Sequence, residues 1–234
     1  MTDTKERPIL FSAPMVRAIL AGTTTQTRRV IKGDLDDEAR LHVGMYHPTV
    51  TDRHGQEHPG AEVFGAWTTD GEWAMRCPHG QPGDRLWVRE SFSGPYCMEA
   101  QDGMAAAPPS TWVNGSRIWY WADGEPTHGD WTRPRPSIHM PRWASRITLE
   151  VTAVKVERLQ DISEADAKAE GAEPMGVLPD WTDEEISLID WPLGERENPY
   201  RNGYALLWES INGPGSWALN PWVWCVSFKR LEAA

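Results

Sequence analysis

The sequence SAPMVRAILAGTTTQTRR, from Ser12 to Arg29, decides the start of the fold because it predicts one capped helix followed by a polar turn. Ser12 suits the N-cap position, where its hydroxyl can accept a hydrogen bond from a backbone amide, and Pro14 suits the first turn. Gly22 ends the helix because it tolerates the left-handed conformation of a C-cap. Apolar residues recur at helical spacing, so one face is expected to be buried: Met15, Val16, Ile19 and Leu20.

The residues after Gly22 bring hydroxyl, amide and guanidinium groups together, namely Thr23, Thr24, Thr25, Gln26, Thr27, Arg28 and Arg29. This set of donors and acceptors suits an anion or the edge of a nucleobase. The alternative is a threonine-rich turn that leads into a strand with a solvated arginine pair.

The remaining strands are predicted from alternating polarity. In Arg85–Phe92, Leu86 and Val88 share one face, and Glu90 falls on the same face, where a carboxylate needs a partner such as an early arginine. Further strands are expected at Arg28–Lys32, Ser116–Ala122, Ile147–Val156 and Trp222–Phe228, while Gly33–Gly71 is expected to be rich in loops, with room for a hairpin.

Three more helices follow from capping signals. Ser163 is expected to cap a helix that stops at Gly171, with Asp166 at the capping-box position. Thr182 is expected to cap an acidic helix, and Asn198 opens a helix whose apolar face is Tyr200, Tyr204, Leu207 and Ile211. Short strands broken by Gly and Pro, with helices between them, indicate an α+β protein built on a small β-barrel.

The motifs resemble the ASCH domain of the PUA-like superfamily. The ILAG helix followed by Thr25-Gln26-Thr27-Arg28 is similar to the opening of that domain, and Gly83–Phe92, Arg146–Gly171 and Trp222–Leu231 fit the same pattern. Together they resemble ASCH-like proteins often found in phage and prophage genomes. The resemblance implies a single domain over 1–234 with a PUA-like β-barrel, flanking helices and loop-rich, Trp-rich insertions at about 31–74 and 94–137, and a helical acidic insertion at about 172–215.

Composition limits the classes of function. The net charge of −11 argues against a general basic surface for duplex nucleic acid, yet Arg17, Arg28, Arg29 and Lys32 cluster near the start, and Arg133, Arg135, Arg142 and Arg146 form a second group. A local basic groove on an acidic body is therefore possible. The 14 Trp exceed Phe and Tyr combined, so most are expected to pack in the core or insertions.

No metal or cofactor is expected. The three Cys form no CxxC pair, and the spacing of His42, His47, His54 and His58 fits no helix-borne or finger-type site. Cys77-Pro78-His79 could supply two ligands, but a buried thiol beside a turn is the preferred interpretation. Without a signal peptide or a membrane-spanning apolar run, the protein is expected to be soluble and cytoplasmic.

The stretch Ser137–Arg146, SIHMPRWASR, precedes the longest predicted strand and is expected to lie at a barrel mouth. Its polar and aromatic side chains are then candidates for ligand contact: His139, Arg142, Trp143 and Arg146. In the equally weighted alternative, Met140 and Trp143 plug the barrel while the arginines pair with local acids.

The resemblance also implies a site. In the superfamily, a cleft between the first helix and the barrel commonly receives RNA or a single nucleobase. One ASCH branch is similar to an amidohydrolase that removes acyl groups from modified cytidine. By position, the proposed catalytic Thr and Glu of that branch correspond to Thr27 and Glu170.

The proposed catalytic Lys of that branch corresponds to Thr24, which cannot activate a Thr nucleophile. Lys32, Lys155 or Lys168 could substitute through space; Glu170 is either a base with a raised pKa or a solvated residue at a helix end.

Three functions remain open. The first is binding or processing of RNA or a modified nucleobase or nucleoside, through Thr24, Gln26, Arg28, Arg29, His139, Arg142, Trp143 and Arg146. The second is an active hydrolase in the same cleft, acting on acylated cytidine or on RNA as a ribonuclease. The third is a phage-encoded factor whose acidic, Trp-rich insertions bind a host protein; the Lys-to-Thr departure favours the first over the second.

Overall fold

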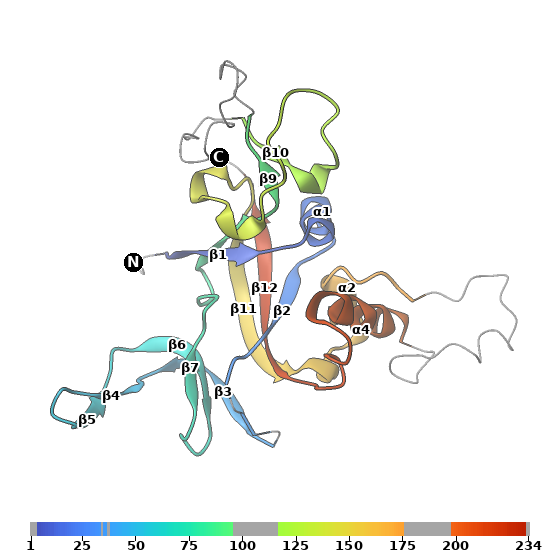
Figure 1. Ribbon diagram of the computed structural model, residues 1–234. Helices are drawn as coiled ribbons and strands as arrows, with labels where there is room; N and C mark the ends of the chain where they lie inside the picture. The colour runs from blue at the N-terminus through green and yellow to red at the C-terminus, as the bar shows by residue number, and fades with distance from the viewer. Residues whose placement is uncertain (1–3, 34, 37, 96–116, 176–197, 233–234) are drawn as a thin grey trace, which may run out of the picture. The chain divides into compact units, whose positions relative to one another are not determined.

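The computed structural model describes residues 4–33, 35–36, 38–95, 117–175 and 198–232. Contacts divide the chain into two compact units: unit 1 is Met1–Gly22, Gly83–Glu150 and Lys229–Ala234, and unit 2 is Thr23–Pro82 and Val151–Phe228. The fold is mixed α+β, with more sheet than helix (Figure 1), so the predicted class is confirmed. In the described part of the chain, no helix is both long and apolar enough to cross a membrane.

The largest sheet has five strands in the order β1-β8-β11-β12-β2. Their bounds are β1 Glu6–Leu10, β8 Arg85–Arg89, β11 Thr148–Arg158, β12 Trp222–Leu231 and β2 Gln26–Val30. The predicted strands at 147–156 and 222–228 and most of the one at 85–92 thus belong to one sheet. The predicted strand 85–92 is divided, because β8 ends at Arg89 and Phe92 belongs to a strand of another sheet. β1 runs parallel to β8, whereas β11 is antiparallel to β8 and β12 to β2.

A closed barrel is not seen among the described residues, in contrast to the expectation. The order of hydrogen-bonded strands begins at β1 and ends at β2, so each of these two strands has a neighbour on one edge only. The strands that were predicted are present, but the sheet that they form stays open.

Unit 1 carries the first helix, α1 Ala13–Ala21. Ser12 occupies the N-cap position without a side-chain capping bond, and Gly22 adopts the left-handed conformation at φ 75°, as expected for the C-cap. Of the predicted apolar face, Val16 and Ile19 are buried. The chain then leaves the helix at the predicted residue, because only glycine takes this conformation at little cost.

A second, small cluster in unit 1 surrounds β9 Phe92–Ser93, which pairs with β10 Trp119–Tyr120. The predicted strand 116–122 is shorter than expected, because the 3-10 helix Trp121–Asp123 interrupts it. The 3-10 helices Ser137–His139 and Arg142–Ala144 follow. Phe92, Met140 and Ala144 are buried together, with Trp143 packed against them.

Unit 2 contains more regular structure in 33–71 than predicted. β3 Leu41–Tyr46, β6 Val63–Thr68 and β7 Ala74–Arg76 form an antiparallel sheet, and β4 Thr49–Thr51 pairs with β5 Glu57–Pro59. Cross-strand ring contacts that the local pattern did not reveal stabilise it, since Trp67 packs against His42 and Tyr46. All four histidines of this window are exposed, as expected.

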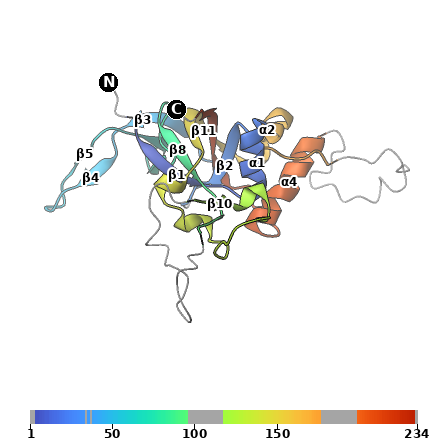
Figure 2. The same ribbon diagram turned by 90° about the horizontal axis from the view of Figure 1, so that it is seen from above.

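The helices α2 Glu164–Ala169 and α4 Pro199–Asn212 lie side by side in both views of unit 2 (Figures 1 and 2). They bury a cluster that includes Tyr204, Trp208 and Cys225. Ile211, predicted on the buried face of α4, is 54% exposed, because the buried stripe runs through Tyr204 and Trp208 instead. The predicted helix after Thr182 and most of the loop 94–110 lie outside the described residues.

Candidate functional site

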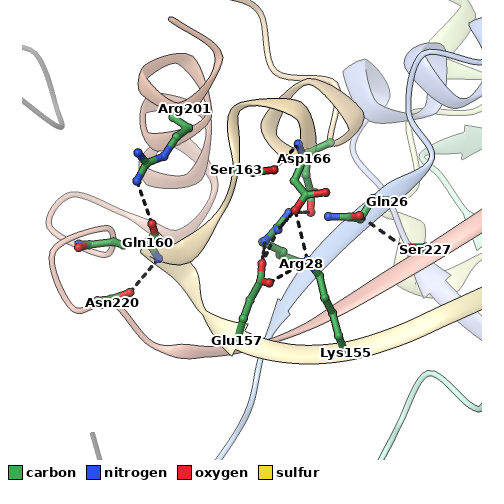
Figure 3. Close-up of polar contacts among 11 residues, drawn as sticks. Gln26, Arg28, Lys155, Glu157, Gln160, Ser163, Asp166, Arg201, Asn220 and Ser227 are labelled. Atoms are coloured by element: carbon green, nitrogen blue, oxygen red, sulfur yellow. Dashed lines mark hydrogen bonds and ion pairs between the residues drawn. The ribbon is translucent and has the colours of Figure 1, made fainter. Parts of the chain in front are cut away.

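Arg28 is the centre of a buried cluster of charges in unit 2. Its side chain is fully shielded from solvent, and its Nη1 donates a hydrogen bond to Glu170 Oε1 at 2.9 Å. Its Nε and Nη2 both donate to Glu157 Oε1, and Nη2 also lies 3.3 Å from Asp166 Oδ2 (Figure 3). One guanidinium therefore contacts three carboxylates, which are drawn from two separate elements.

Local structure explains how these carboxylates reach Arg28. Glu157 lies near the end of β11, and Asp166 and Glu170 lie on and just after α2. Ser163 accepts a hydrogen bond from the Asp166 backbone amide at 3.0 Å, so the predicted N-cap is confirmed. This cap fixes the start of the short helix, from which Asp166 points toward Arg28 on β2 (Figure 3). Glu170, just after the helix, accepts a hydrogen bond from the same guanidinium.

Lys155 adds a second positive charge at the rim of the cluster. It lies two residues before Glu157 on β11, hence on the same face of that strand. Its Nζ is 2.8 Å from Glu157 Oε2 and 3.2 Å from Asp166 Oδ2. The side chain of Lys155 is 49% exposed, so this contact is open to solvent whereas the Arg28 contacts are not.

The three carboxyl groups differ in their pKa values. Burial raises the pKa of Glu170 to about 7, and the Arg28 guanidinium only partly opposes this shift. For Glu157 and Asp166, burial also acts to raise the pKa, but the hydrogen bonds from Lys155 and the charge of Arg28 outweigh it, so both pKa values are lowered. Glu170 is therefore the group of this cluster that exchanges a proton near neutral pH.

Two further polar groups share this face of the sheet. Cys225 pairs in register with Arg28, and Ser227 pairs with Gln26. The Gln26 amide, with its oxygen turned toward Arg28, accepts a hydrogen bond from Nη1 at 2.8 Å. Burial raises the pKa of the Cys225 thiol, so this residue stays protonated and is not a nucleophile at neutral pH.

Thr24 is a buried hydroxyl just before β2. Only 3% of the residue is exposed, and its Oγ1 has no hydrogen-bond partner within the part of the chain that the structure describes. The next residue, Thr25, donates its backbone N–H to Ala169 O at 3.0 Å, which brings this turn against the end of α2 beside Glu170. A buried hydroxyl without a partner is uncommon and costs free energy.

Thr27 and Arg29 are the neighbours of Arg28 on β2, one on each side in sequence. Successive side chains of a strand point to opposite faces, so Thr27 is expected to face away from the side that Arg28 and Cys225 share. Thr27 is 1% exposed. Burial lowers the pKa of Arg29, with the charge of Glu170 opposing the shift. The pairing of Thr27 with Glu170 as nucleophile and base stays a prediction.

The other predicted ligand residues belong to unit 1. Arg146 binds Glu90 through Nε and Nη2, at 2.9 and 3.0 Å, and binds Asp123 at 2.7 and 2.8 Å. Glu90 is buried, as its place in the alternation predicted, but its partner is Arg146 rather than an early arginine. Arg142 forms an ion pair with Glu6.

These contacts match the ion-pair part of the second alternative for Ser137–Arg146, whereas the barrel that Met140 and Trp143 were expected to plug is not seen among the described residues. Met140 is buried and Trp143 packs beside it, while both arginines pair with acids of the same unit. His139 is exposed. Because Arg28 and Arg29 belong to unit 2, a cleft shared with the unit 1 arginines stays a prediction.

The sequence did not single out Glu157, which lies at the Arg28 cluster. It named Lys155 only as a possible substitute for the expected lysine, and Tyr204 only as part of the apolar face of a helix, although both also lie at this cluster. The guanidinium of Arg28 is 6.0 Å from the centroid of the Tyr204 ring. A usable signal was present in β11, where Lys155 and Glu157 share the face of a mostly apolar strand at a spacing of two. For Asp166 the sequence indicated only the capping-box position after Ser163.

A pocket lies in the 33–74 region of unit 2. It has a volume of about 550 Å³, and no member of the Arg28 cluster lines it. Its wall includes four acids and Trp73, namely Asp36, Glu38, Asp70 and Glu72 with the indole. Among the described residues no group of three or more His, Cys, Asp or Glu could hold a metal ion, and Cys77 is buried.

Compared with protein-family models, with curated proteins and with solved structures, the chain gives no match in any of the three.

Proposed function

We propose that this protein binds RNA or a modified nucleobase or nucleoside, and that the ligand contacts the turn and strand from Thr24 to Arg28. The observation that carries the proposal is the Thr24 hydroxyl, which is buried without a partner in the described residues, beside the end of α2 where Glu170 meets Arg28. A ligand group that hydrogen-bonds to Thr24 Oγ1 would recover about 1–3 kcal/mol of desolvation cost.

The neighbouring groups have the chemistry of base recognition. The Thr24 hydroxyl can both donate and accept a hydrogen bond, and the Gln26 amide has an N–H₂ donor and a carbonyl acceptor. The Glu170 carboxyl, with a pKa of about 7, can donate when protonated and accept when ionised near neutral pH. Base edges present the same alternation of donors and acceptors. A neutral, polar ligand of this kind fits a buried site better than a free phosphate, because three carboxylates already surround Arg28.

The resemblance to the ASCH domain supports the same proposal. It implies a PUA-like fold, here with an open sheet among the described residues, together with a ligand cleft beside the first helix, a phage or prophage origin and a cytoplasmic location. We include each of these in the proposal. The Thr-x-Thr-Arg motif that carries the resemblance contains Gln26 and Arg28, which lie in the buried cluster.

The test is a binding measurement with a matched pair of threonine variants. Isothermal titration calorimetry is run with cytidine, uridine, adenosine, guanosine and acylated cytidine on wild type, Thr24→Val and Thr25→Val. Valine keeps the shape of threonine and removes the hydroxyl. Thr24→Val is expected to weaken binding at least about tenfold while raising the free energy of unfolding, because a buried unpaired hydroxyl is removed.

Thr25 is exposed, so Thr25→Val serves as the control and is expected to change neither binding nor stability by much. Equal affinity of wild type and Thr24→Val would contradict a ligand at this hydroxyl. Absence of binding by wild type to every nucleoside and to short RNA would point to a partner protein instead, and the acidic pocket beside Trp73 would then be the surface to examine.

A second candidate is a hydrolase in the same site, favoured by one observation. The pKa of Glu170, raised to about 7 by burial, suits a general base. The expected direction of Thr27, on the opposite side of β2 from Arg28, favours binding over hydrolysis by a Thr27–Glu170 pair.

A further inference from the structure

The sheet of unit 1 has one buried face and one solvent face. Ile9, Leu86, Val88 and Leu149 are 0–4% exposed and form the buried face. The residues between them in β1, β8 and β11 alternate to the other side. The register groups that other side into three rows: Glu6, Arg85 and Glu150; then Pro8, Trp87 and Thr148; then Leu10 and Arg89.

This solvent face is positively charged although the whole chain carries −11. Arg85 and Arg89 project from β8, Arg142 reaches over the rows from the 3-10 helix at 142–144, and Lys229 adds a charge from β12. Their acidic neighbours are Glu6, which pairs with Arg142, and Glu150, which pairs with Lys229 at 2.9 Å. Four cations and two carboxylates leave a local charge of +2.

An indole lies among these cations. The guanidinium carbon of Arg89 is 5.1 Å from the centroid of the Trp87 ring, and that of Arg142 is 5.9 Å away. Arg89 Nε donates to Met140 O at 3.0 Å. The ring and a backbone carbonyl hold Arg89 at the surface, and the described residues include no ion pair to it. Arg85 is exposed in the adjacent row.

We propose that this solvent face of β1, β8 and β11 binds single-stranded RNA. Proteins bind single strands with a basic surface that follows the phosphates and with flat aromatic or guanidinium groups on which bases stack. An indole with guanidinium groups close to its ring offers both, because the ring and the guanidinium planes can stack on bases while the N–H groups donate to phosphate oxygens. An acidic peptide would satisfy the charges but leave the apolar side chains of this face without a role, namely Trp87 in the second row and Leu10, which is 39% exposed, in the third.

This site is distinct from the one around Thr24. It lies in unit 1, uses none of the same residues, and does not depend on the proposed nucleoside contact. It would let the protein hold an RNA strand through its backbone whatever base the other site selects.

The test uses fluorescence anisotropy with a labelled ten-nucleotide oligouridylate, titrated at several salt concentrations. Each phosphate contact adds about 0.7 to the magnitude of the slope of log affinity against log salt. Arg85→Gln and Arg89→Gln are each expected to reduce that magnitude by about this amount. Arg53→Gln, an exposed arginine in the β4–β5 hairpin, removes the same charge elsewhere and is expected to leave the slope unchanged.

Variants of Trp87 test base stacking separately from phosphate contact, and Thr24→Val tests whether this surface is independent of the nucleoside site. Trp87→Leu is expected to weaken binding at every salt concentration with an unchanged slope, whereas Trp87→Phe, which keeps a flat ring, is expected to retain most of the affinity. Thr24→Val is expected to bind the oligonucleotide as wild type does, so failure of the nucleoside proposal would not affect this one. Equal slopes for Arg53→Gln and Arg85→Gln, or displacement of the RNA by polyglutamate at equal charge concentration, would overturn the proposal.

Discussion

Arg28 Nη1 donates a hydrogen bond to Glu170 Oε1 at 2.9 Å, and the two side chains are only 0% and 2% exposed. Breaking a buried pair of opposite charges is costly, because each partner would be left buried and unpaired. This cost holds the two side chains together. The pair ties β2 to the end of α2, although 142 positions separate the two residues. It therefore makes the stability of unit 2 depend on a few charged groups.

Removal of Arg28 should be costly. Arg28→Met would leave Glu170 buried beside Glu157 and Asp166 without the guanidinium, and we expect a loss of about 3–5 kcal/mol in the free energy of unfolding. Lys155→Met, which removes the half-exposed cation of the same cluster, is the control and should cost less than about 1 kcal/mol. Urea denaturation measures both, and equal losses would contradict the special place of Arg28.

Glu170 should make stability depend on pH around neutrality. Its pKa in the folded protein is raised from 4.5 to about 7, so the folded state holds the proton more tightly than the unfolded state. The resulting contribution to the free energy of unfolding is complete below about pH 4.5 and is lost as the pH rises through about 7. Wild type should therefore lose stability over this range through Glu170.

Glu170→Gln imitates the protonated carboxyl and should remove that loss. The difference in free energy of unfolding between the variant and wild type should shift in favour of the variant by up to about 3 kcal/mol from pH 5 to pH 8. Glu173→Gln, at an exposed position, is the control and should show no such trend. A difference that does not vary with pH would mean that Glu170 stays charged throughout.

The ion pairs of Arg146 and Arg142 in unit 1 should differ in strength. Burial raises the pKa of Glu90, and Arg146 is the cation that contacts it. Arg146→Met should cost about 3 kcal/mol because it leaves Glu90 buried and unpaired. Arg142→Met breaks a pair in which both side chains are more than a third exposed, so it should cost less than about 1 kcal/mol. Thermal denaturation of both variants decides whether this contrast exists.

Hydrolysis of acylated cytidine by wild type should be weak or absent, because Thr24 stands where a lysine is expected from the resemblance. Positioned acid–base catalysis contributes roughly a hundred- to ten-thousand-fold, and Thr24→Lys is expected to raise the rate if the site geometry tolerates it. Release of free cytidine is measured for wild type, Thr24→Lys, Thr27→Ala and Glu170→Ala. Fast turnover by wild type that Thr27→Ala abolishes would establish the hydrolase over the binding protein.

Local sequence signals predicted the elements well because they act within one or two turns of chain. The Gly22 C-cap, the Ser163 cap and the alternation of Leu86 and Val88 each concern neighbouring residues, and each appears as expected. The same alternation correctly predicted that Glu90 points inward. For 33–71 the sequence indicated loops with room for one hairpin, and it did not show the further strands, because their stabilising contacts, such as Trp67 with Tyr46, join residues of separate strands.

The sequence by itself therefore determined where several helices and strands lie and that Thr24, Arg28 and Glu170 are candidates for the chemistry. Only the tertiary structure decided which charges meet. Arg28 could have faced solvent or any of many acids, and it contacts residues 129 to 142 positions away because β2, β11 and α2 pack together. Glu170 became a group that titrates near neutral pH for the same reason, since burial depends on what covers a side chain and not on its neighbours in sequence.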